Sequence, residues 1–119
     1  MKLHNGRGWL KKDGTRIAPL EVAASHKKRT RGLLGRNGVE GAFLISPCSG
    51  VHTFQMRFPL DVAYLDRSWT VIAIVRMKRN RLGRNRLRAR HVLEAEWGAL
   101  ERWGVSRGDR LEIEYDATR

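Results

Sequence analysis

The chain has a single cysteine, only three prolines and no long apolar run. One cysteine, Cys48, excludes an internal disulfide, and because small secreted domains often depend on disulfides, we expect a reducing, cytoplasmic location. The longest uninterrupted apolar run is 71–75, far below the roughly 20 residues that cross a bilayer, so we expect no transmembrane segment. Residues 1–10 lack the apolar stretch of a signal peptide, and no export is expected.

Length and composition predict one domain over residues 1–119. Of the 119 residues, 41% are hydrophobic and 30% are charged, as in globular proteins. A chain of this size buries roughly two thirds of its unfolded surface, so its stability requires no metal or disulfide. Paired ligand spacings such as CxxC or HxxxH are absent, and we therefore predict no metal and no cofactor.

The net charge of +12 is unevenly distributed. Residues 1–90 hold 20 Lys and Arg against five Asp and Glu, a balance of +15, whereas residues 91–119 hold four against seven, a balance of −3. Of the 24 basic residues 18 are Arg, whose planar guanidinium suits phosphate and carboxylate. The basic excess therefore lies before the C-terminal tail.

Apolar patterning predicts a mainly β fold of six or seven short strands and two short helices. The expected strands cover 6–14, including a turn at 12–14, and then 17–23, 42–45, 60–65, 69–75, 89–97 and 111–115. We expect 60–65 and 69–75 to form a hairpin at the centre of the sheet. Ser25 can cap a helix that Gly32 or Gly35 ends, and a second short helix lies near Leu100. This pattern favours a compact sandwich or barrel, with 77–88 as an exposed basic loop.

Several short motifs together resemble one known family. They are Arg31 to Arg36 (RGLLGR), Pro47-Cys48, Val51 to Phe54 (VHTF), Met56-Arg57, Pro59 to Val62 (PLDV), Val92 to Glu94 (VLE) and Gly104 to Asp109. Over about residues 16–114 the chain resembles DUF192, a conserved prokaryotic domain of unknown function. The resemblance implies a jelly-roll-like, mainly β domain with no established activity. Gln55 departs from the family, which commonly has Gly or Trp before the Met-Lys/Arg pair.

The densest chemical cluster lies beside the expected core strands. Five polar or reactive side chains fall within fourteen residues, namely Cys48, His52, Gln55, Arg57 and Asp61. Imidazole can accept a thiol proton, so Cys48 and His52 could form a nucleophile and base, although a free cysteine is more often a small buried apolar residue. Arg57 and Asp61 could pair, or Asp61 could accept main-chain hydrogen bonds. A pocket formed by this segment is our first candidate for a ligand-binding site.

Glu94 is a further ligand-binding candidate. It shares the polar face of the expected strand 89–97 with Glu96, and two carboxyl groups side by side can serve acid-base chemistry. The simpler expectation is that both are solvated or pair with the preceding basic segment.

The stretch 76–90 has eight basic residues in fifteen and no acidic residue. Such a field favours phosphate contacts and nonspecific nucleic-acid binding, with a solvated loop as the alternative. The anion-binding candidates are Arg76, Lys78, Arg79, Arg81, Arg84, Arg86, Arg88 and Arg90.

Three functional hypotheses follow. The first is a small noncatalytic domain that binds a ligand or protein partner near Cys48 to Asp61. The second is binding of an anionic polymer such as nucleic acid through the Arg-rich loop. The third is an enzyme that uses Cys48 and His52, and whether the chain is an enzyme stays open at this point.

Overall fold

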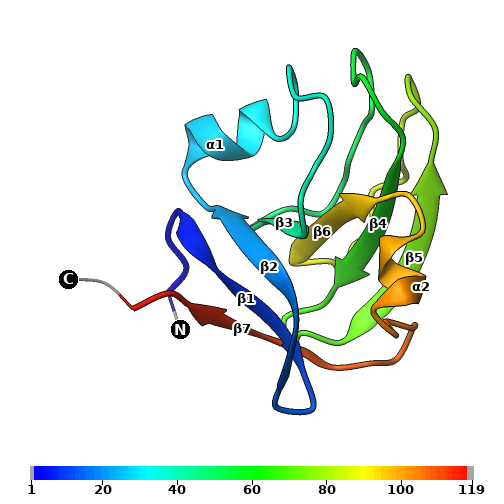
Figure 1. The fold of residues 1–119 in the computed structure, drawn as a ribbon. Coiled ribbons are helices and arrows are strands. Elements are labelled where there is room, and N and C mark those ends of the chain that lie inside the picture. Colours follow the sequence, from blue (N-terminus) through cyan, green and yellow to red (C-terminus); the bar gives the residue numbers. More distant parts are fainter. Residues whose placement is uncertain (1, 118–119) are drawn as a thin grey trace.

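The apolar segments pair into one mixed seven-stranded sheet in the computed structural model, which describes residues 2–117 (Figure 1). The elements in chain order are β1 (Gly6–Lys12), β2 (Thr15–Ala23), α1 (His26–Arg31), β3 (Ala42–Ile45), β4 (Leu60–Leu65), β5 (Val71–Met77), β6 (His91–Glu96), α2 (Ala99–Arg102) and β7 (Leu111–Tyr115). Across the sheet the strand order is β5-β4-β6-β3-β2-β1-β7. The prediction of a mainly β fold with two short helices is confirmed.

All neighbouring strands run antiparallel except β2 and β3. A parallel pair needs a long crossover connection, and here residues 24–41, including α1, supply it. Ser25 caps α1 as predicted, because its hydroxyl accepts a hydrogen bond from the N–H of Lys28 at 3.2 Å. Gly32 ends the helix with a φ of 53°, a left-handed conformation that favours glycine.

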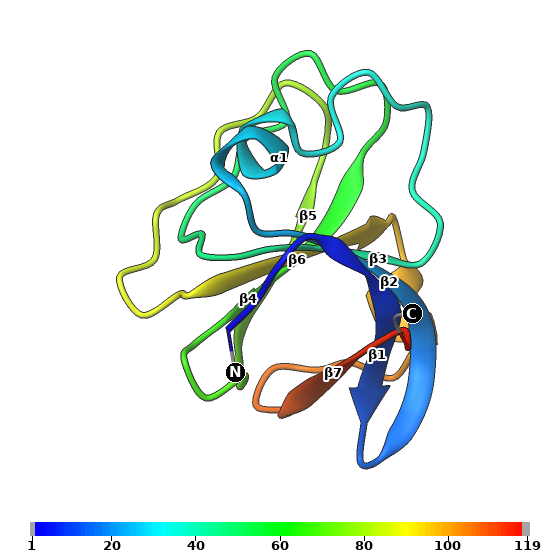
Figure 2. The same ribbon diagram turned by 90° about the vertical axis from the view of Figure 1, so that its left-hand side faces the viewer.

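Each face of the sheet carries its own apolar core. The inner core fills the concave side of the curved sheet and includes Leu10, Leu20, Leu44, Leu93 and Leu100. The outer core lies on the opposite side and includes Leu33, Phe43, Met56, Val62 and Val92. Figure 2 shows α1 on this outer side. Because β3, β4 and nearly all of β6 are buried on both faces, even the polar positions of these strands lie in the interior.

The sheet curls strongly but stays open (Figure 2). The starts of the two edge strands β5 and β7 meet, where the N–H of Val71 donates to the oxygen of Asp109 at 2.8 Å and that of Leu111 donates to Trp69 at 3.0 Å. Only Thr70 and Arg110 form a bridge there within residues 2–117. The expected sandwich or barrel is therefore not formed, and a jelly roll is not shown, because strand patterning predicts which residues are buried but does not specify which strands pair.

One further expectation about the sheet is wrong. The predicted hairpin exists, with its second strand at Val71–Met77 instead of 69–75, but β5 is an edge strand of the sheet rather than part of its centre. The basic segment 78–90 is largely exposed and belongs to no strand or helix, and main-chain hydrogen bonds attach it to residues 49–53. These bonds include Thr53 N–H to Arg81 O and Gly83 N–H to Val51 O, both 2.8 Å long. Chain composition does not reveal this attachment, because it depends on backbone groups, which every residue type carries.

Candidate functional site

A small pocket of about 90 Å³ lies over the outer face of the sheet, between α1 and the segment that follows β3. Its walls come from three stretches that are distant in sequence. The lining residues are Arg29, Thr30, Arg31, Gly32, Leu33, Leu34, Ile45, Cys48, Gly50, Val51, His52, Met56 and Glu94. The structure thus brings together three of the predicted candidates, Cys48, His52 and Glu94.

Glu94 is the buried polar group of this pocket. Strand β6 pairs with β3 on one side and β4 on the other, so its main chain is fixed and Glu94 must face the outer core. The residue is only 4% exposed. Burial raises the pKa of its carboxyl group to about 7, and within residues 2–117 no hydrogen bond or charge offsets that effect. The expectation of a solvated Glu94 is therefore wrong, because the segments around α1 and Cys48 cover this face.

Two hydrogen bonds hold Cys48 in place, one from its main-chain N–H and one from its thiol. Its N–H donates to the carbonyl of Arg90 at 2.9 Å, and its thiol donates to the carbonyl of Gly50 at 3.0 Å. Burial, the largest effect, raises the pKa of the thiol. A raised pKa keeps the sulfur protonated at neutral pH, which is the opposite of what a thiolate nucleophile requires.

His52 lies at the mouth of the pocket. Its Nδ1 accepts a hydrogen bond from the N–H of Phe54 at 3.3 Å, and its ring stacks on that of Phe54 with centroids 5.3 Å apart. Its main chain bridges to Leu82 of the basic segment. Because the thiol of Cys48 donates to Gly50 instead, no hydrogen bond joins Cys48 to His52 in the part of the chain that the structure describes.

Asp61 lies on the inner face, away from the pocket. It is 2% exposed, and its Oδ2 accepts hydrogen bonds from the N–H groups of Gly98 at 3.0 Å and Leu100 at 3.3 Å, at the start of α2. Arg76 forms an ion pair with its Oδ1 at 3.3 Å. Asp61 therefore holds α2 against the sheet.

The other two predicted candidates lie on the exposed loop before β4. Arg57 does not reach Asp61 and donates instead to the side chain of Asn37 at 2.9 Å. Gln55 is exposed and has a φ of 61°, and its N–H donates to the side chain of Asn80 at 3.0 Å. Neither of them lines the pocket.

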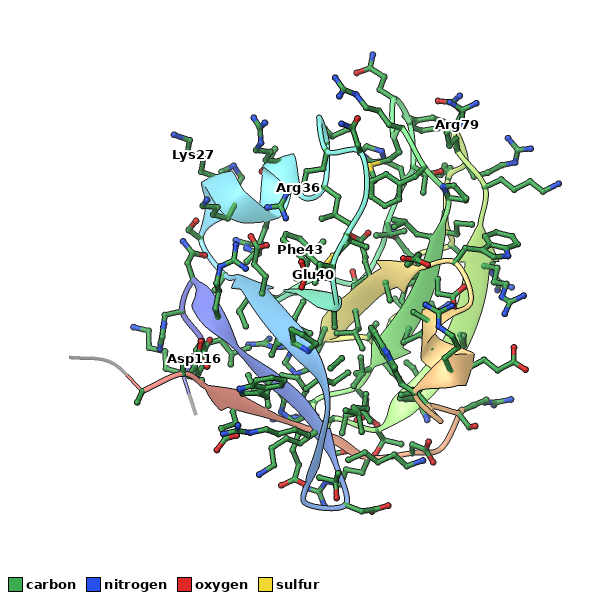
Figure 3. The ribbon with its side chains drawn as sticks, in the orientation of Figure 1. Lys27, Arg36, Glu40, Phe43, Arg79 and Asp116 are labelled. Carbon is green, nitrogen blue, oxygen red and sulfur yellow. The ribbon has the colours of Figure 1, made fainter. Side chains whose placement is uncertain are left out.

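Several basic residues lie at the end of the molecule that carries α1. Figure 3 shows Lys27 on α1 and Arg79 after β5 at this end. Arg29 is fixed there, since its guanidinium donates to the carbonyls of Ala24 at 3.1 Å and Pro47 at 3.2 Å. Arg29 and Arg31 line the pocket, and Glu94 is the one acidic residue in its lining.

The sequence did not predict a buried pair of polar side chains, Ser46 and His91. Ser46 and His91 share a hydrogen bond of 2.6 Å between Oγ and Nδ1, and the ring of Trp69 stacks on His91 with centroids 3.8 Å apart. Burial lowers the pKa of His91 to about 4, so this histidine is neutral at physiological pH. No sequence signal links these three residues, because they meet through the pairing of β3 with β6 and the turn before β5.

The pocket's apolar wall was also missed as a site. Leu33, Leu34 and Met56 belong to the motifs quoted above, but their spacing gave no reason to place them opposite Cys48. The structure offers no metal site in residues 2–117, because no three His, Cys, Asp or Glu side chains lie close enough together to hold a metal ion. No helix there is long and apolar enough to cross a membrane.

Comparison with known proteins gives a family and a fold. Residues 9–113 match the family DUF192, described as "Uncharacterized ACR, COG1430". The crystal structure of a "putative transcription regulator" from Sinorhizobium meliloti 1021 superposes with a TM-score of 0.79 at 21% identity, covering 95% of this chain and 98% of that one. A protein of unknown function from Novosphingobium aromaticivorans DSM 12444 gives a TM-score of 0.71 at 20% identity, covering 89% and 83%. These identities show a shared fold alone, and no functionally curated protein matches the sequence.

Proposed function

The chain belongs to the DUF192 family, and we propose that it is a noncatalytic module that binds a small carbonyl- or carboxylate-bearing ligand in the pocket of Cys48, His52 and Glu94. The observation that carries this proposal is the carboxyl group of Glu94, a nearly buried residue of the pocket lining whose pKa is raised by burial with no hydrogen bond or charge in residues 2–117 to offset it. Buried polar groups are almost always hydrogen-bonded, so an unsatisfied one at a pocket wall points to a ligand or water as its partner.

The charge around the pocket selects the kind of ligand. With a pKa of about 7, Glu94 keeps its proton in much of the protein at neutral pH and can donate it in a hydrogen bond to an oxygen. Arg29 and Arg31 lie in the same lining and disfavour a cation. A volume of about 90 Å³ is small, and it fits a group of a few heavy atoms, such as an acyl end, rather than a whole cofactor.

Binding is favoured over thiol catalysis by the state of Cys48. Its pKa is raised, and its proton is engaged by Gly50 rather than by His52. A reducing compartment such as the cytoplasm would keep the thiol unoxidised, and this is the location that we propose.

The test is a titration followed by amide NMR shifts at pH 6, with acetate, acetamide and methylammonium as probes. Acetate and acetamide should shift the amides around Cys48 and Glu94, and methylammonium should not. Glu94→Gln replaces the O–H donor of the carboxyl group with an amide N–H donor and should weaken acetate binding. Glu96→Gln is the matched control, because it removes an exposed carboxylate from the same face of the same strand. Preference for methylammonium, or equal effects of the two variants, would show that the proposed role of Glu94 is wrong.

A further inference from the structure

A larger cleft of about 480 Å³ lies between the end of β5 and the basic segment 78–90. It is separate from the pocket of Glu94 and shares none of its lining residues. The cleft is lined by Tyr64, Val75, Arg76, Met77, Lys78, Arg81, Leu82, Gly83, Arg84, Arg86 and Trp97. Its volume falls within the range of about 300–1,000 Å³ that is typical of small-molecule sites.

The lining holds five cationic side chains and no carboxylate. Arg76 is neutralised, since it pairs with Asp61 at 3.3 Å and Glu101 at 3.1 Å. The other four cations, at positions 78, 81, 84 and 86, form no ion pair within residues 2–117. Several unpaired cations facing one cleft repel one another, and an anionic ligand would relieve that repulsion.

Hydrogen bonds hold the main chain of the segment that carries these cations in place. Thr53 fixes the segment by donating its hydroxyl to the carbonyl of Lys78 at 2.6 Å and by accepting from the N–H of Arg81 at 2.8 Å. Gly83 packs so closely that an added Cβ would lie 2.8 Å from the oxygen of Val51 and 2.9 Å from the hydroxyl of Tyr64. Because the main chain of the segment is already held, little main-chain conformational freedom would be lost when a ligand binds.

Arg86 and Trp97 give the cleft its particular chemistry. The guanidinium of Arg86 lies 4.8 Å over the ring of Tyr64, and its buried Nε has no hydrogen-bond acceptor in the described part of the chain. A buried donor without an acceptor is costly, and a ligand oxygen would satisfy it. Trp97 is 38% exposed, with Arg76 5.3 Å over its ring, and aromatic rings of this kind stack on planar bases.

We propose that this cleft binds a mononucleotide, with its phosphates held by Lys78, Arg84 and Arg86 and its base against Trp97. Guanidinium groups bind phosphate through paired hydrogen bonds, and the tryptophan supplies the surface for a planar ring. The phosphate chemistry is shared with single-stranded nucleic acid, so the test must separate the two sources.

The experiment is calorimetric titration of the folded chain with ADP, adenosine, pyrophosphate and a ten-nucleotide oligo-dT at 50 mM and 200 mM salt. We expect ADP to bind more tightly than pyrophosphate and adenosine not to bind measurably. The double variant Lys78→Ala/Arg84→Ala should weaken ADP binding by about tenfold or more, as expected for loss of charge-assisted contacts.

The matched control is Arg79→Ala/Arg88→Ala, which removes the same charge from the same segment at two exposed positions outside the cleft lining. Figure 3 shows Arg79 just after the end of β5. The control should keep ADP affinity within about threefold, since exposed charges that do not line the cleft are screened by salt. Equal losses in both double variants, equal affinity for pyrophosphate and ADP, or binding of oligo-dT without binding of ADP would each overturn the proposal.

Discussion

Replacing Glu94 by Gln should stabilise the protein at alkaline pH and leave its stability unchanged at acidic pH. Burial raises the pKa of Glu94 in the folded protein from its ordinary value of 4.5 to about 7. The folded state therefore binds this proton more tightly than the unfolded chain. Below pH 4.5 Glu94 is protonated in both the folded and the unfolded chain, so it causes no loss of stability. As pH rises from 4.5 towards 7 the free energy of unfolding falls, because only the unfolded chain ionises this carboxyl group.

The magnitude follows from the two pKa values. The interval from 4.5 to about 7 corresponds to about 3 kcal/mol of stability, at about 1.4 kcal/mol for each tenfold change in proton affinity. Glutamine has nearly the same shape and cannot ionise, so Glu94→Gln removes the loss. The variant should be about 3 kcal/mol more stable than the natural chain at pH 8.5 and nearly equal to it at pH 4.

Urea unfolding of both proteins between pH 4 and pH 8.5 measures this difference. Comparing the two proteins at each pH is essential because His91 acts in the opposite direction: its pKa is lowered to about 4, so it adds stability as pH rises towards 6.5. The subtraction removes this shared contribution. The exposed Glu96→Gln should give a flat difference. If the difference for Glu94→Gln is also flat, or if the variant loses stability at alkaline pH, the reasoning about a buried unpaired carboxyl is refuted.

Three further predictions concern other parts of the chain. Asp61→Ala should lower the free energy of unfolding by about 2 kcal/mol, because the N–H groups at the start of α2 lose their acceptor. The control Glu101→Ala removes an exposed carboxylate and should change the free energy of unfolding by less than about 0.5 kcal/mol. Equal losses in the two variants would contradict the capping role of Asp61. Gly8→Ala should lower the free energy of unfolding by about 3 kcal/mol or more, since the new Cβ would lie 1.9 Å from the main-chain oxygen of Glu114. The control Gly38→Ala places its Cβ in open space and should leave the stability unchanged. Equal shifts of the denaturation midpoint in the two variants would refute the close approach at Gly8. Iodoacetamide should label the thiol of Cys48 far more slowly in the folded protein than in urea at pH 7, because burial raises its pKa; rapid labelling of the folded chain would reveal an activated thiol.

The local features of the fold were predictable because adjacent residues encode them. The cap at Ser25, the stop at Gly32 and the turn between β4 and β5 each depend on side chains within a few positions of one another. In that turn the carboxylate of Asp66 accepts hydrogen bonds from the N–H groups of Ser68 at 2.9 Å and Thr70 at 3.0 Å. Such contacts form in any context that leaves the segment intact.

The candidate site was predictable only in part. Cys48 and His52 stood out because reactive residue types lie four positions apart, and the structure places both at one pocket. Glu94 was expected on a solvated face because alternation in a strand separates two faces without revealing what covers each of them. Asp61 is close to Cys48 in sequence but lies on the inner face, where it binds the start of α2.

The sequence by itself determined where strands, turns and helix caps form, and which residues are chemically reactive, since these depend on side-chain type and short spacing. Tertiary structure alone decided the strand order, the open curl of the sheet and the burial of Glu94. It also attached the basic segment to residues 49–53 and so shaped a cleft from charges that the sequence showed only as a run. The physical reason is that these features depend on main-chain pairing between distant segments, and backbone hydrogen-bonding groups are nearly identical at every position.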